Sequence, residues 1–340
     1  MCLKKYFCNS LYLNICTTCN LKCDWCYKQS SKSYMLSFVN FEKFYERIIR
    51  QNIEKITLIG GEPTMHPDFL SIIEQLNEKQ IFLNTNGLMF SEPKFLFDCI
   101  NLRDNVRYYY GYKSGLQAIA ISLKGYDRIS FLNTTKVDGF ERLCYAITNL
   151  NDCDISTTYT YTYAENMNID QIDSFISFLN KYKINTIVLN DVRPYYQGNN
   201  MVKHPKLING LDKLMYSLES SGITAYLRMN HPLCNYNPEL LDYVIKNQRL
   251  ISRCAVKSSN GYFFSPSLEL IPCNELFPVV LGKFETDFNS FAELEQLWDT
   301  QYIRCFYQKL SGYPEIKCQQ CSLWKICGGS CILHWVKEKE

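Results

Sequence analysis

The stretch CNLKCDWC at residues 19–26 places three cysteines, Cys19, Cys23 and Cys26, at C-x3-C-x2-C spacing. Cysteines this close together cannot close a useful disulfide framework, but their thiolates can hold one metal cluster from three sides. A cuboidal [4Fe–4S] centre fits this spacing, because three irons each take one thiolate and the fourth has no protein ligand. The fourth iron is then open to a small molecule that brings its own donor atoms.

A second motif lies about thirty-five residues further along the chain. The apolar run 56–59 reads as a buried strand, and it ends in Gly60, Gly61, Glu62 and Pro63. Glycines at the end of a strand let the backbone approach a ligand closely. The pattern therefore predicts a ligand-binding turn directly after the second strand.

The two motifs together resemble those of the radical S-adenosylmethionine (SAM) enzymes, whose cluster motif is C-x3-C-x-aromatic-C. Trp25 stands in the aromatic position. In that family the GGEP segment follows the second barrel strand and meets the methionine amine of SAM. The resemblance implies a [4Fe–4S] cluster on the three cysteines and a SAM site bordered by Trp25, Gly60, Gly61, Glu62 and Pro63.

Short apolar strands alternate with amphipathic helices from about residue 10 to residue 230. The expected strands are 11–16, 56–59, 81–84, 118–122, 155–163 and 186–190, and the expected helices are 41–51, 67–78, 93–102, 139–150, 169–182 and 205–220. Six β/α units predict an α/β fold with a parallel sheet and right-handed crossovers. The family's partial (β/α)6 barrel has the same count, and we assign residues 1–235 to it.

Two further strand ends are candidates for contact with SAM, because in such barrels the chemistry lies after the carboxyl ends of the strands. Asn84 opens the turn Asn-Thr-Asn-Gly after the third strand, which is similar to a TNG turn in the family. Ser122 ends the fourth strand in Ile-Ser-Leu-Lys-Gly, where the family commonly has a serine that meets the ribose. Asn, Ser and Gly are also ordinary turn residues, so a purely structural role stays open.

The C-terminal region carries a second group of cysteines at C-x2-C-x5-C-x3-C spacing. They are Cys318, Cys321, Cys327 and Cys331. This spacing resembles the core of the SPASM extension of radical SAM enzymes, a small cysteine-rich domain with auxiliary [4Fe–4S] clusters, which we place at 236–340. Cys254 and Cys273 resemble the two cysteines that precede the core, and they flank an expected hairpin at 262–271. A structural zinc site is the alternative, since thiolate spacing alone does not choose the metal.

The extension departs from the family's pattern at two points. Leu268 stands where the family usually has a glycine, and no cysteine follows Cys331. Six cysteines cannot fully ligate two four-iron clusters. One or two auxiliary clusters are therefore expected, and at least one of the family's two is incomplete, differently ligated or absent.

The family's interleaved pattern implies how the cysteines divide. Cys254, Cys273 and Cys331 would serve the cluster nearer the barrel, and Cys318, Cys321 and Cys327 the outer one. A missing ligand could come from Cys234, Cys305, His334 or a carboxylate. Alternatively, the nearer cluster could leave one iron free to bind substrate.

Composition excludes several classes of protein. The chain has 340 residues and a net charge of only +2, which gives no electrostatic footprint for non-specific nucleic-acid binding. Seventeen cysteines without a charged-then-apolar leader argue against secretion and a disulfide scaffold. No apolar run approaches the ~18 residues of a membrane span. We therefore expect a cytoplasmic protein that binds neither nucleic acid nor membrane.

The resemblance implies that SAM is cleaved reductively to a 5′-deoxyadenosyl radical, which abstracts a hydrogen atom from the substrate. Enzymes with SPASM-type cysteines mostly modify a peptide or protein, often a ribosomally made natural product, and this is the expected substrate. A flavodoxin or ferredoxin would supply the electron. Because the cluster motif begins at residue 19, leader recognition would need a separate protein or the barrel rim.

Two alternatives stay open. The first is a radical SAM dehydrogenase or rearranging enzyme that acts on a small molecule, and the second is a non-catalytic metal-binding module. The sequence contains no recognisable acid/base pair, so it assigns no catalytic side chain.

Overall fold

An eleven-stranded sheet organises the structure, a computed structural model that describes residues 9–26, 33–104, 114–153, 155–163, 167–197, 200–202, 210–251, 254, 256, 261–311, 314 and 316–335. The strands lie in the order β10-β9-β6-β5-β4-β3-β2-β1-β11-β12-β13. All neighbours from β10 to β11 are parallel, and β11, β12 and β13 are antiparallel. The strands of this sheet are β1 (Ser10–Cys16), β2 (Lys55–Gly60), β3 (Gln80–Thr85), β4 (Gly115–Leu123), β5 (Ser156–Tyr163), β6 (Thr186–Asp191), β9 (Thr224–Arg228), β10 (Leu250–Ile251), β11 (Tyr262–Phe264), β12 (Glu269–Ile271) and β13 (Gly282–Lys283).

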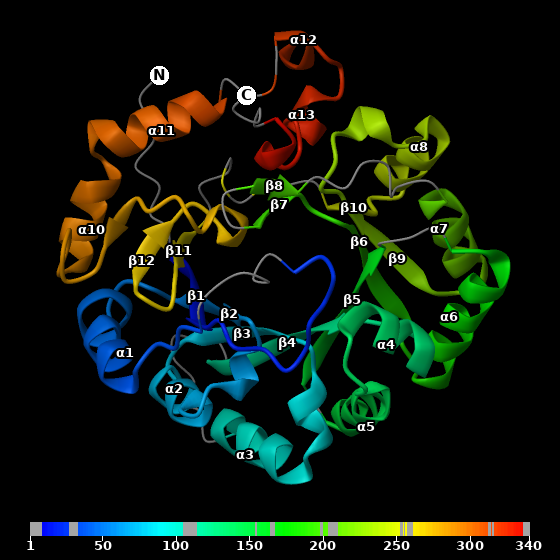
Figure 1. Ribbon diagram of the computed structural model, residues 1–340, viewed down its shortest axis with the longest axis horizontal. Helices are drawn as coiled ribbons and strands as arrows, with labels where there is room; N and C mark the ends of the chain where they lie inside the picture. The colour runs from blue at the N-terminus through cyan, green and yellow to red at the C-terminus, as the bar shows by residue number, and fades with distance from the viewer. Residues whose placement is uncertain are drawn as a thin grey trace.

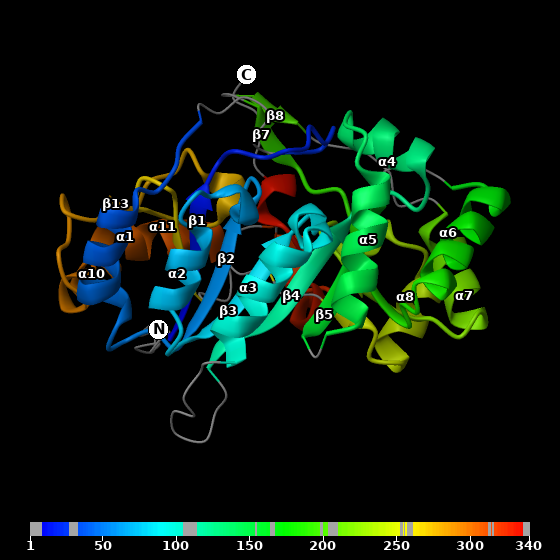
Figure 2. The same ribbon diagram turned by 90° about the horizontal axis from the view of Figure 1, so that it is seen from below.

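Helices cover the outer face of the parallel strands, as Figures 1 and 2 show. The helices of the barrel are α1 (Phe38–Phe44), α2 (Phe69–Gln75), α3 (Pro93–Asp104), α4 (Arg128–Thr135), α5 (Phe140–Asn151), α6 (Ile169–Lys181), α7 (Leu211–Ser220) and α8 (Pro238–Lys246). A π-helical turn, Tyr45–Ile49, continues α1. A separate hairpin of β7 (Tyr195–Gln197) and β8 (Asn200–Val202) follows β6.

Alternating side chains explain how the strands pack. In β1, Leu11, Leu13 and Ile15 are fully buried in the main core. In β9, Ala225 and Leu227 are buried in the same core. Because successive side chains of a strand point to opposite faces, the residues between them line the other face of the sheet.

That other face is the inside of a barrel. Five strands lie between β1 and β9 in the sheet, yet the side chains of Tyr12 and Arg228 interact electrostatically. Only a sheet that curves round on itself brings these two strands together. Tyr12 and Arg228 therefore lie on the interior face of the curved sheet.

The C-terminal region continues this sheet. β11 pairs with β1 in parallel register, and the hairpin of β11 and β12 confirms the predicted turn at 262–271. The remaining helices are α10 (Phe291–Trp298), α11 (Gln301–Ser311), α12 (Ile316–Gln319) and α13 (Trp324–Cys327). In Figure 1, α12 and α13 (red) lie between α11 and α8. The boundary at 235/236 stays a prediction; α8 and β10 lie beyond it, and β10 pairs with β9.

The predicted α/β fold with a parallel sheet is confirmed. All six predicted strands exist with ends shifted by up to three residues, and the start of the helix expected at 205–220 lies outside the described residues. The six predicted β/α units run from β1 to α7, and β9 and β10 extend the parallel sheet beyond β6. Helix α4 was not predicted from the sequence. It begins with a capping box formed by Asp127 and Ser130.

Among the described residues, no helix is both long and apolar enough to cross a membrane.

Candidate functional site

The cysteine loop follows β1 at the carboxyl end of the sheet, and two neighbouring elements hold it there. The side chain of Asn86, after β3, donates a hydrogen bond of 2.7 Å to Asn20 Oδ1. The backbone nitrogen of Lys22 donates one of 2.9 Å to the carbonyl of Thr135, at the end of α4. The turn after β3 and the end of α4 thus both hold the segment between Cys19 and Cys23.

The three thiols of the loop form no disulfide, and they are close enough to interact electrostatically with one another. Burial raises the pKa of Cys19 to about 12 and also raises the pKa of Cys23. The backbone nitrogen of Leu21 donates a hydrogen bond of 3.4 Å to Cys19 Sγ. Bound metal replaces the thiol protons, and hydrogen bonds to sulfur tune a cluster.

This donor set fits an iron–sulfur cluster. Within the described residues, no three His, Cys, Asp or Glu side chains converge at the spacing of a single bound metal ion. Cysteines that hold a four-iron cluster need not converge on one point, since each binds a different iron. Cys19, Cys23 and Cys26 interact with one another, and their binding of a cluster stays a prediction.

The GGEP turn is joined to the end of β1 by its backbone. The nitrogens of Gly61 and Glu62 donate hydrogen bonds of 2.8 Å to the carbonyls of Cys16 and Thr18. A Cβ atom on Gly61 would lie 2.3 Å from the Thr18 carbonyl oxygen, and one on Gly60 would lie 2.7 Å from that of Cys16. The glycines are therefore required by the backbone next to them, a reason that the sequence alone did not reveal.

Replacing Gly61 by alanine should destabilise the protein by about 1–3 kcal/mol or more, because the new methyl group overlaps backbone atoms that cannot rotate away. Gly222→Ala is the matched control. The φ of Gly222 is +78°, which is strained for alanine, but nothing lies within 4 Å of its Cβ position. We therefore expect this variant to lose only about 1 kcal/mol of stability. Urea unfolding midpoints compare the two, and a Gly61 variant no less stable than the Gly222 variant would contradict the packing argument.

Glu62 links the GGEP turn to the turn after β3. Its carboxylate is only 1% exposed, and burial raises its pKa against the opposing effect of its hydrogen bonds. Oε1 accepts hydrogen bonds from the hydroxyls of Thr64 (2.7 Å) and Thr85 (2.6 Å), and Oε2 accepts one of 2.7 Å from the nitrogen of Asn86. Oε2 can accept another bond, which suits an ammonium group of a ligand.

The other predicted SAM contacts lie around the same strand ends. Asn84 is exposed and Ser122 is half-buried, and both alternate with core residues of β3 and β4. Trp25 is half-buried in the cysteine loop, and Pro63 starts the turn after Glu62. Their contacts with SAM stay predictions.

Asn86 belongs to the Asn-Thr-Asn-Gly turn that the sequence offered as a candidate for contact with SAM, together with Asn84. It is 6% exposed, and its side chain reaches both Asn20 and, at 4.0 Å, Cys19 Sγ. Only the fold shows which of the two asparagines faces the cysteine loop.

The C-terminal cysteines form two groups. In the inner group, Cys254, Cys273 and Cys331 interact electrostatically with one another, and they pack around a small core of their own. The residues of that core are Val256, Leu276, Ile332 and Leu333. Burial raises the pKa of Cys331 to about 12 and that of Cys273 well above its ordinary value.

The outer group contains Cys318, Cys321 and Cys327, which also interact electrostatically. The turn between Cys327 and Cys331 has three residues with positive φ: Gly328 (52°), Gly329 (79°) and Ser330 (59°). This reversal lets the two ends of a C-x3-C unit face different groups. The cysteines in each group are those that the family's interleaved pattern implies. Cluster binding at each group stays a prediction.

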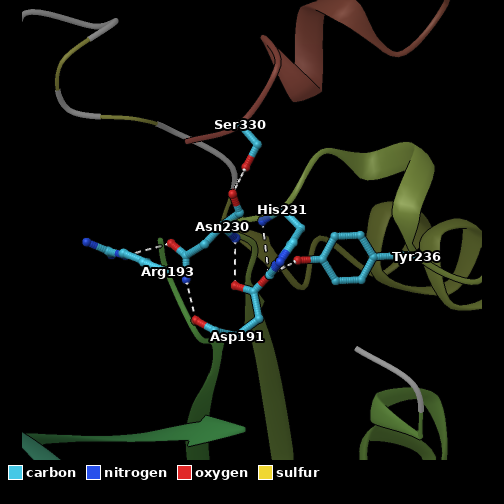
Figure 3. A network of polar contacts seen from close by, with 6 residues as sticks. All are labelled: Asp191, Arg193, Asn230, His231, Tyr236 and Ser330. Atoms are coloured by element: carbon cyan, nitrogen blue, oxygen red, sulfur yellow. Dashed lines mark hydrogen bonds and ion pairs between the residues drawn. The ribbon is translucent and has the colours of Figure 1, made fainter. Parts of the chain in front are cut away.

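A buried polar network holds the inner group against the barrel (Figure 3). Asp191, at the end of β6, accepts hydrogen bonds from the backbone of Asn230 (2.7 Å), the ring of His231 and the hydroxyl of Tyr236 (2.5 Å). Burial would raise the pKa of Asp191, but the interactions with His231 and Tyr236 outweigh burial and lower it. The Asn230 carbonyl accepts a hydrogen bond of 2.5 Å from Ser330, next to Cys331.

Arg193 extends the network to the inner cysteines. Its guanidinium donates to Asn230 Oδ1 (2.7 Å) and to Glu275 (2.8 Å), two residues after Cys273. The Glu275 carboxylate holds the pKa of Arg193 well above its ordinary value. β6, β9 and the turn after β12 thus meet beside the inner thiols.

Leu268 keeps the turn that a glycine usually makes. Its φ is +56°, a left-handed conformation that costs a non-glycine residue about 1–2 kcal/mol. The side chain is only 5% exposed in the main core, and its packing offsets the backbone strain. The departure from the family pattern therefore leaves the hairpin intact.

The comparisons with known proteins agree with this geometry. Residues 13–179 match the sequence model described as Radical SAM superfamily. This part of the chain belongs to the radical SAM superfamily. The match spans β1 to α6, and it includes both the cysteine loop and the GGEP turn.

Curated relatives cover part of the chain. A probable GTP 3′,8-cyclase from Sulfurisphaera tokodaii is 22% identical over 60% of this chain and 63% of its own length. One from Thermoplasma volcanium is 25% identical over 49% of both. The chain thus matches about half to two thirds of these relatives.

Two solved structures share the fold over nearly the whole length of this chain. SuiB from Streptococcus suis, bound to S-adenosylmethionine, is 18% identical with a TM-score of 0.69 and covers 98% of this chain and 75% of its own. The anSMEcpe structure, with bound AdoMet and a peptide, is 17% identical with a TM-score of 0.66 and covers 97% and 91%. At these identities the likeness shows the fold, and the covered length includes the C-terminal cysteine region.

Proposed function

We propose that this radical SAM enzyme cleaves SAM reductively and abstracts a hydrogen atom from a peptide or protein substrate. The observation that carries the proposal is the meeting of three thiols, none of them in a disulfide, with the GGEP turn and Asn86 at the carboxyl ends of parallel strands. The peptide substrate is supported by two similar structures, one of SuiB bound to precursor peptide SuiA and one of anSMEcpe with a bound peptide.

The residues of this chain divide the work of such a reaction. When bound, a [4Fe–4S] cluster and SAM supply a 5′-deoxyadenosyl radical that takes hydrogen from a C–H bond. Cys19, Cys23 and Cys26 would hold the cluster, and the turn at 60–63 would border the methionine end of SAM. Glu62 keeps that turn against Asn86, so the two ligand-facing turns move as one unit.

The remaining partners follow from the same proposal. A flavodoxin or ferredoxin supplies the electron, and a separate protein or the barrel rim recognises the leader of the peptide. The inner and outer cysteine groups hold one or two auxiliary clusters in residues 236–340. An auxiliary cluster gives the substrate radical a place to deliver its electron.

A small anionic molecule is the second candidate substrate, and Arg228 favours it. Among the described residues, no carboxylate pairs with this interior guanidinium, whose pKa is lowered by burial and by the nearby charge of Arg193. A half-buried cation beside a second cation suits a bound carboxylate or phosphate. The relatives named GTP 3′,8-cyclase support this candidate.

Substrate-dependent SAM cleavage separates the candidates. Reconstituted, reduced protein is mixed with SAM and one of three additions: GTP, the metabolites or the peptides of the source cells. We expect the peptide fraction alone to raise 5′-deoxyadenosine release above the uncoupled rate, and protease treatment of that fraction to remove the effect. Stimulation by GTP or metabolites alone would reject the peptide and select the second candidate.

A further inference from the structure

We propose that Cys234 is the fourth ligand of an iron–sulfur cluster held by the outer group, Cys318, Cys321 and Cys327. The inference rests on the proposed function only in expecting an iron–sulfur cluster at this group. It assigns to a residue of the barrel the ligand that completes the set of Cys318, Cys321 and Cys327.

The backbone places Cys234 beside the outer group. The residue lies in a short 3-10 turn, Leu233–Asn235, between β9 and α8. The nitrogen of Leu233 donates a hydrogen bond of 3.4 Å to Cys327 Sγ. Consecutive Cα atoms are about 3.8 Å apart, so this bond brings Cys234 to the same sulfur-rich surface.

Cys318 also interacts electrostatically with the other three thiols. Cys318 feels the charges of Cys234, Cys327 and Cys321, and Cys234 is the strongest of these three. All four are free, and Cys234 and Cys321 are exposed, so an incoming cluster can reach them. Four cysteines from two distant parts of the chain therefore share one neighbourhood.

A four-thiol set matches what a [4Fe–4S] cluster without an open iron requires. The other candidates for the missing ligand are less well placed. His334 stacks on His231 with ring centroids 4.3 Å apart, near the inner cysteine Cys331. Cys305 lies in α11, and no described contact joins it to the outer thiols.

Neighbouring contacts hold both halves of the proposed site in place. The Asn230 carbonyl, just before the turn of Cys234, accepts hydrogen bonds from Ser330 Oγ (2.5 Å) and from the nitrogen of Cys331 (3.2 Å). A cluster bound to Cys234 and Cys318 would link the barrel to a C-terminal segment that is distant from it in the sequence. With Cys234 in the outer group, the inner group keeps three thiols.

Metal analysis of the full chain tests the assignment. Cys234→Ser and Cys305→Ser are reconstituted anaerobically beside the wild type, and iron, sulfide, zinc and EPR spectra are measured on each. For Cys234→Ser we expect roughly four fewer irons and sulfides per chain, or the EPR signal of a [3Fe–4S] cluster. Cys305→Ser should match the wild type in every measurement, and circular dichroism confirms that both variants are folded.

Two results would overturn the assignment. One is wild-type iron, sulfide and EPR spectra in Cys234→Ser, and the other is zinc in place of iron at the outer group of the wild type. Release of 5′-deoxyadenosine by the wild type is recorded separately. Its absence would reject the proposed function without changing the metal count on which Cys234 is judged.

Discussion

Replacing Cys19, Cys23 and Cys26 together by alanine is expected to lower 5′-deoxyadenosine release by several powers of ten. Without the three thiolates no cluster stays at the mouth of the barrel, and SAM receives no electron. Iron at the inner C-terminal cysteines should remain, because Cys254, Cys273 and Cys331 pack against a separate core. Chromatography of the reaction products and iron analysis measure both effects.

Cys144→Ser is the matched control for this variant. Cys144 is a half-buried cysteine of α5 that belongs to neither motif, so its replacement should leave cleavage unchanged. Continued cleavage of SAM by the triple variant would refute the assignment of the radical-generating cluster to residues 19–26.

Replacing Cys254, Cys273 and Cys331 by alanine should spare uncoupled SAM cleavage but lower product formation by several powers of ten. An oxidised product cannot form when the electron of the substrate radical has no acceptor. These thiols lie beside the network of Asp191 and Arg193 at the ends of β6 and β9, remote in sequence from the SAM motifs. Product analysis with the authentic substrate, next to 5′-deoxyadenosine release, measures the two steps separately.

Folding is the confounding effect, because metal binding and folding are coupled in small cluster domains. The variant must therefore be soluble, retain the iron of the first cluster and bind SAM with wild-type affinity. Under those conditions, full turnover of the substrate would show that the C-terminal region is only a structural cap.

Local patterns in the sequence predicted the fold and the first cluster. The alternation in β1 and the spacing of Cys19, Cys23 and Cys26 depend on residues close together in the chain. Strand β9 was missed, although its buried Ala225 and Leu227 alternate with Thr224, Tyr226 and Arg228. Their side chains face the interior of a barrel, where polar residues are tolerated.

Contacts between distant segments could not be predicted in this way. The spacing of cysteines gives no sign that Leu233 meets Cys327, or that Asn230 accepts a hydrogen bond from Ser330. The glycines of GGEP were assigned to ligand approach, whereas the structure shows that the carbonyls of Cys16 and Thr18 also require them. Such requirements arise only once two strand ends lie side by side.

The most direct test of the proposed function measures iron, sulfide and 5′-deoxyadenosine on one anaerobically reconstituted sample of the full chain. We expect iron and sulfide well above four per chain, and we expect the release of 5′-deoxyadenosine to depend on both SAM and a reductant. Protein that binds SAM and iron but releases no 5′-deoxyadenosine on reduction would contradict the proposed function.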